Sequence, residues 1–139
     1  MIGRIYMRSF NKKVSFIESI PIIMGILFAI IIEIYRILNP MYGILLRGYN
    51  HLLAGIIMPY MFYILWFKED YYKISNKYFL KNISNKDFSC LLYLIGSFIW
   101  ELGQVIIRGY IQLDQYIFDL LGIGMIFLLF KYKEFKNKK

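Results

Sequence analysis

The sequence has one cysteine, one histidine and no long polar segment. Cys90 cannot form an internal disulfide or a multi-cysteine metal site, and we expect it to pack as a small apolar residue in a third helix. His51 has no second histidine or cysteine with which to complete a zinc site. The longest polar segment, Lys68–Asp87, is too short for a sizeable soluble domain. These shortages exclude a disulfide-stabilised fold, and we expect no metal and no cofactor.

Acidic residues are also scarce, with 9 against 17 basic residues and a net charge of +8. The basic residues gather in an N-terminal arm, a middle segment and a C-terminal tail: Arg4, Arg8, Lys12, Lys13; Lys68, Lys73, Lys77, Lys81, Lys86; Lys131, Lys133, Lys136, Lys138 and Lys139. A net positive charge of this size is compatible with nucleic-acid binding. Clustering between apolar runs instead indicates membrane topology and contact with anionic lipids, so we expect no nucleic-acid partner.

What the chain does have is apolar residues, which make up 59% of it, with a mean hydropathy of +0.51. They form four runs: Val14–Leu38, Tyr49–Phe67, Phe88–Ile107 and Tyr116–Phe130, the last extended to about residue 113. A membrane-spanning helix needs about 20 such residues, and its backbone must be helical because lipid offers no hydrogen-bond partner. The sequence predicts an all-α polytopic membrane protein with four transmembrane helices in a single domain, residues 1–139.

The three basic segments are alternate connections of a four-helix chain, so they share one side of the membrane. The positive-inside rule places both termini and the middle segment in the cytoplasm. Connections 39–48 and 109–114 then face outward, and Pro59 is expected to kink the second helix. We expect the first run to remain attached as a membrane helix, because Glu18 lies inside it and no small-x-small cleavage site follows.

Most ionisable residues in the apolar runs lie toward this outer side. They are Glu33 and Arg36 in the first helix, Arg47 and His51 at the start of the second, Glu101 and Arg108 in the third, and Asp114 and Asp119 in the fourth. Each charge inside a membrane costs roughly 2.5–3.5 kcal/mol on insertion scales, so these groups are expected to face the bundle interior. The sequence therefore predicts a polar cluster beneath the outer surface.

Helical spacing supports this cluster. Glu101, Gln104 and Arg108 share one face of the third helix at i, i+3 and i+7. One face of the fourth helix carries Gln115, Asp119 and Gly122. Small residues allow close helix packing, which we expect at Gly122 and also at Gly124.

The segment from Trp100 to Arg108, followed by Asp114 to Gly122, resembles the VanZ-like family of small bacterial four-helix membrane proteins. The shared features are a Glu-x-x-Gln pair followed by an arginine, and then an acidic residue with a later glycine; His51 is similar to the family's second-helix histidine. The chain departs from the family pattern at five places: Gln115 in place of a second acid, Asp119 in place of asparagine, a shorter spacing from Gln104 to Arg108, Arg47-Gly48 in place of Asp-Lys, and Ile126 in place of a second glycine. The resemblance implies a role in the bacterial cell envelope and in resistance to glycopeptide antibiotics such as teicoplanin.

Two interpretations of the polar cluster stay open: a ligand site, or a structural set of interhelical hydrogen bonds. The candidate ligand-binding residues are His51, Glu101, Gln104, Arg108, Asp114 and Asp119, supported by Glu33, Arg36, Arg47, Gln115 and Gly122. We expect ion pairs between the three arginines and the acids rather than a cation site, a Glu33–Arg36 pair on the first helix, and a capping or interfacial hydrogen-bonding role for His51.

Three functions are compatible with this sequence. The first is a VanZ-like envelope protein that binds an outer-leaflet lipid, a lipid-linked cell-wall precursor or a glycopeptide through its arginines. The second is an accessory or scaffold subunit whose polar cluster is purely structural. The third is a membrane enzyme acting on a lipid-linked phosphate, for which the chain shows no nucleophile or phosphatase motif, so we assign no catalytic residue.

Overall fold

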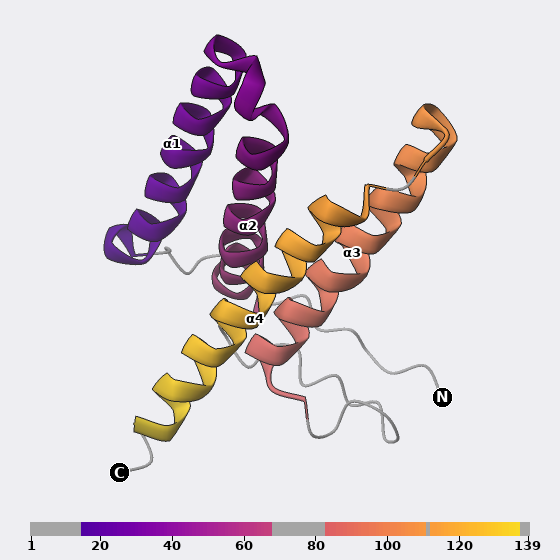
Figure 1. Ribbon diagram of the computed structural model, residues 1–139. Coiled ribbons are helices and arrows are strands. Elements are labelled where there is room, and N and C mark those ends of the chain that lie inside the picture. The colour runs from indigo at the N-terminus through magenta and orange to yellow at the C-terminus, as the bar shows by residue number, and fades with distance from the viewer. Residues whose placement is uncertain (1–14, 68–82, 111, 137–139) are drawn as a thin grey trace.

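A computed structural model describes residues 15–67, 83–110 and 112–136 (Figure 1). Their helices are α1 (Phe16–Leu38), a 3₁₀ turn η1 (Pro40–Tyr42), α2 (Gly43–Phe62), a π-helical segment η2 (Tyr63–Phe67), α3 (Asn85–Arg108) and α4 (Leu113–Lys136). The described residues contain no strand. The predicted all-α class is therefore confirmed.

The helix ends follow from local hydrogen bonding. The backbone N–H of Ser15 donates to the Glu18 carboxylate at 3.2 Å, which begins α1 with an acidic group at its positive end. In the same way, the Ser84 hydroxyl accepts from the backbone N–H of Asp87 at 3.1 Å and caps α3. Gly109 ends α3 with φ of 80°, a left-handed conformation that glycine adopts without a steric penalty.

Three helices, α1, α3 and α4, are long and apolar enough to cross a membrane. This finding indicates a multi-pass membrane protein. The 20-residue α2 is not among the three, because Arg47, Asn50 and His51 make its first half polar.

Two predicted boundaries were wrong. The outer connection was expected to run to Gly48, but α2 already begins at Gly43, since the turn after Pro40 takes only three residues. The fourth helix was expected to end at Phe130, but α4 continues to Lys136. Two bonds to α3 hold this added part of α4: Lys131 donates to Asp87 at 2.7 Å, and Glu134 accepts from Lys86 at 3.3 Å. Pro59, fully buried in α2, is followed by the π-helical η2.

Packing places α2 at the centre of the bundle, in contact with α1, α3 and α4. The apolar core forms between α3 and α4 from Cys90, Ile123, Ile126 and Phe130, with α2 residues packed against it. Cys90 is only 5% exposed, which confirms its predicted role as a buried apolar residue. Large apolar side chains of α1 point away from the bundle, as lipid-facing residues do.

The closest helix crossing joins α2 and α4, where Gly55 and Gly122 meet. The predicted close approach at Gly122 is confirmed, and the one at Gly124 is wrong, because a Cβ built there has no neighbour within 4 Å. Figure 1 shows that the α1–α2 and α3–α4 connections lie toward the same end of the molecule. We call this end, which holds residues 39–42, 109–110 and 112, the connection end.

Candidate functional site

A buried carboxylate, Asp119 of α4, joins three helices. It is 2% exposed and accepts a hydrogen bond from the Tyr93 hydroxyl at 3.1 Å and a short one from the Ser97 hydroxyl, both on α3. Its Oδ2 also lies 3.1 Å from Nδ1 of His51 on α2. Two hydroxyl donors and an imidazole nitrogen therefore surround one carboxyl group. Asp119 and these three partners are called the Asp119 network below.

Sequence reasoning found His51 and Asp119 but missed Tyr93 and Ser97. Both precede Glu101 at four-residue intervals, so they extend the polar face of α3 that begins with Glu101. That spacing was the available signal. It was weak because the chain holds 13 tyrosines and hydroxyl groups are common along every helix.

His51 was expected at the start of its helix, in a capping or interfacial role. Because α2 begins at Gly43, His51 instead lies eight residues inside the helix, about 12 Å from its first residue. Its side chain is 20% exposed and faces Asp119. The capping role is therefore wrong, and His51 is part of an interhelical bond.

Glu101 lies one turn beyond Ser97 toward the connection end. It is 2% exposed, and neither carboxylate oxygen has a hydrogen-bond partner in the part of the chain that the structure describes. Gln104, one turn further, is half-buried, and its Oε1 also has no partner there. A buried carboxyl group without a hydrogen-bond partner carries a desolvation penalty, so Glu101 can accept a hydrogen bond that no described residue donates.

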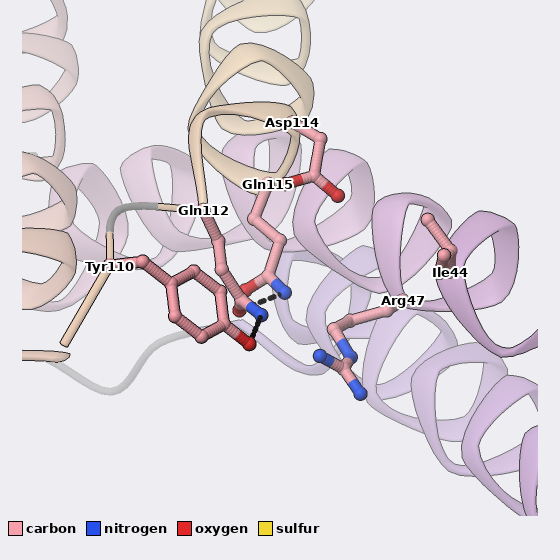
Figure 2. Close-up of a pocket in the computed structure, with 6 residues that line it drawn as sticks. All are labelled: Ile44, Arg47, Tyr110, Gln112, Asp114 and Gln115. Atoms are coloured by element: carbon pink, nitrogen blue, oxygen red, sulfur yellow. Dashed lines mark hydrogen bonds between the residues drawn. The ribbon is translucent and has the colours of Figure 1, made fainter. Parts of the chain in front are cut away.

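A pocket of about 350 Å³ lies at the connection end, between the start of α2 and the α3–α4 connection. Its lining residues are Ile44, Arg47, Tyr110, Gln112, Asp114 and Gln115 (Figure 2). Gln112 donates to the Tyr110 hydroxyl at 3.4 Å and accepts from Gln115. None of the bonds drawn between lining residues in Figure 2 involves Arg47.

Hydrogen bonds do not join the eight predicted residues into a single network. The structure divides them among the Asp119 network, the pocket at the connection end and a pair on α1. In that pair Arg36 bonds Glu33, as predicted, and Glu33 also accepts from Asn50 of α2 at 3.2 Å. At the end of α3 the exposed Arg108 donates to Gln112, which places it beside the pocket.

The expected ion pairs between arginines and the other acids were wrong. Asp119 contacts His51 and two hydroxyls, while Glu101 has no partner among the described residues and Arg108 bonds an amide. Asp114 is exposed and lines the pocket. For Asp119 the physical reason is depth, because it lies farther from the connection end than Arg47 and Arg108.

The described residues contain no group of three or more histidine, cysteine, aspartate or glutamate side chains placed to hold a metal ion. Ser97, His51 and Asp119 include the residue types of a hydrolase triad, but both Ser97 and His51 bond Asp119. In a triad the histidine would bond the serine so that it could accept the serine proton. The observed arrangement is therefore that of a polar link between helices.

No family model, curated protein or solved structure matches this chain. Two residues that carry the VanZ-like resemblance lie near Asp119: His51 contacts it, and Glu101 lies one helical turn from Ser97, which bonds it. Residues from three separate helices are thus gathered in the bundle interior, next to an open pocket.

Proposed function

We propose that this chain is a VanZ-like integral membrane protein of the bacterial cell envelope that binds a phosphate or carboxylate group of an outer-leaflet lipid or glycopeptide. In this proposal all four helices cross the membrane and both termini are cytoplasmic. The three apolar helices support a membrane location. The central position of α2 supports its inclusion as a fourth span, because its neighbours shield its polar residues from lipid.

The observation that carries the binding proposal is the position of Arg47 in the pocket. A guanidinium offers five N–H donors in a planar fork that matches the oxygens of a phosphate or carboxylate. Gln112 and Gln115 supply amide groups on the opposite wall. Bidentate arginine contacts are among the stronger hydrogen bonds, so a guanidinium that bonds no other lining residue of the pocket is suited to orient an anion.

The size and surroundings of the pocket fit a headgroup. About 350 Å³ lies within the usual range of small-molecule sites. Its rim includes the largely exposed Ile44 and Tyr110, and aromatic residues with apolar neighbours are common at the headgroup level of a bilayer. An acyl chain could then follow the apolar helix surfaces while the headgroup occupies the pocket.

The accessory-subunit alternative is favoured by the Asp119 network, which links three helices and needs no ligand to explain it. The two functions make different predictions for Arg47. A scaffold keeps its fold and its partners when Arg47 is replaced, because the structure shows no bond from Arg47 to another pocket residue. A binding protein loses its ligand.

Native mass spectrometry of the detergent-extracted protein with added phosphatidylglycerol tests the binding proposal. Arg47→Gln is expected to retain about tenfold less lipid, which corresponds to one charge-assisted bond. Lys133→Gln removes the same charge from an exposed site near the other end of α4 and is the matched control. Teicoplanin added in place of lipid tests the glycopeptide source. Equal retention of both compounds by Arg47→Gln and the wild type would contradict the proposal.

A further inference from the structure

The Asp119 network and the pocket are related by helical register. One level of the bundle holds the bonded residues His51, Ser97 and Asp119. Four residues nearer the connection end on the same three helices, about 6 Å away, lie Arg47, Glu101 and Gln115. We call this second set the Glu101 level. It forms because α2 and α4 run away from the connection end while α3 runs toward it (Figure 1).

Two members of the Glu101 level, Arg47 and Gln115, line the pocket, and the buried Glu101 lies at the same depth on α3 without being one of the lining residues. Gln115 is itself only 2% exposed, so it forms the inner wall of the pocket (Figure 2). Glu101 occupies the same level on α3, with 2% exposure and two oxygens that lack partners in the described residues. A positive donor and an unsatisfied acceptor therefore lie at one depth on neighbouring helices.

We propose that this site takes a zwitterionic headgroup, with its phosphate on Arg47 and its primary ammonium on Glu101, as in phosphatidylethanolamine. The inference rests on the proposed anion-binding function and adds the second half of the ligand. An ammonium brings three N–H donors, which is what a carboxylate without partners requires. It also places a positive charge beside a carboxyl group that is 2% exposed and therefore held out of water.

The chemistry at Glu101 sets a preference between lipids. The ammonium of phosphatidylcholine carries three methyl groups and no N–H, so it cannot donate to Glu101. Phosphatidylglycerol offers only neutral hydroxyl donors at that position. The phosphate contact with Arg47 is common to all three lipids. Selectivity therefore depends on Glu101, whereas binding of any of them depends on Arg47.

Competitive native mass spectrometry with equal amounts of phosphatidylethanolamine and phosphatidylcholine tests this proposal on the wild-type protein. We expect about a tenfold preference for phosphatidylethanolamine, the value of one charge-assisted hydrogen bond. Glu101→Gln is expected to abolish the preference, and Glu101→Asp, which keeps a carboxylate, to retain part of it. Glu134→Gln, a carboxylate removed at the opposite end of α4, is the matched control and keeps the full preference.

The outcomes separate this proposal from the one it rests on. Loss of all three lipids in Arg47→Gln, with no headgroup preference in the wild type, overturns the role of Glu101 and leaves the anion site. Unchanged binding in Arg47→Gln overturns both. Displacement of the lipid by an equal concentration of free phosphoethanolamine would assign a soluble ligand and overturn the lipid assignment. Because the wild-type preference needs no variant, the test holds even if Glu101→Gln fails to fold.

Discussion

Gly55 of α2 and Gly122 of α4 are in backbone contact: a Cβ built on Gly122 would lie 2.8 Å from the Cα of Gly55 and 2.3 Å from the carbonyl oxygen of Leu52. No side chain fits between the two helices at this point. The crossing lies about one helical turn from Asp119 along α4, on the side away from the connection end. It therefore fixes the distance between α2 and α4 at which His51 contacts the Asp119 carboxylate.

Gly122→Ala is expected to destabilise the bundle by about 2 kcal/mol, because the added methyl group meets backbone that cannot move aside. Gly124→Ala, two residues away in open space, is the matched control and should be neutral. Thermal unfolding of the two purified variants, followed by circular dichroism in detergent, measures the difference. Equal melting temperatures for both variants would show that the helices do not cross here.

Asp119→Ala is expected to lower the free energy of unfolding by roughly 3–5 kcal/mol, because it leaves His51 and two hydroxyl groups buried without an acceptor. Tyr93→Phe removes a single bond of the same network, and its cost should be about 1 kcal/mol. Denaturant unfolding in mixed micelles compares the two variants. A loss for Asp119→Ala no larger than that for Tyr93→Phe would rule out Asp119 as the common acceptor.

The proposed topology predicts that a reporter fused after Lys139 stays cytoplasmic and that the α3–α4 connection is outside. In a Cys90→Ser background, a single cysteine at position 110 should react with an impermeant maleimide added to intact cells. A cysteine in place of the exposed Lys133, at the other end of α4, should react only after lysis. The reverse labelling pattern would invert the membrane orientation and move the pocket to the cytoplasmic side.

Much of the fold could be predicted from the sequence because hydrophobic run length alone determines where membrane helices form. The errors occur where polarity misled the interpretation. Arg47 and Gly48 were predicted to lie in a loop. Gly48 is instead a buried residue of α2 that faces the Phe118 ring of α4. The lysines after Phe130 were predicted to lie in a C-terminal tail. Lys131 is instead part of α4 and pairs with Asp87 of α3.

The candidate site could be predicted only in part, since spacing along one helix shows which residues share a face but not which helix they meet. The Glu33–Arg36 pair is local and was predictable. The bond between Ser97 and Asp119 depends on the register of two antiparallel helices, which is fixed by packing at Gly122 and the core around Ile126. No single-helix pattern contains that information.

The central claim is that the pocket beside Arg47 holds a lipid phosphate within the membrane. Photocrosslinking in native membranes tests it most directly, with benzoylphenylalanine in place of Tyr110 on the pocket wall and, as control, in place of the exposed Tyr132. We predict a phospholipid adduct at position 110 that disappears in Arg47→Gln, while any adduct at position 132 is unaffected by that change. An adduct at position 110 that persists unchanged in Arg47→Gln would contradict the account.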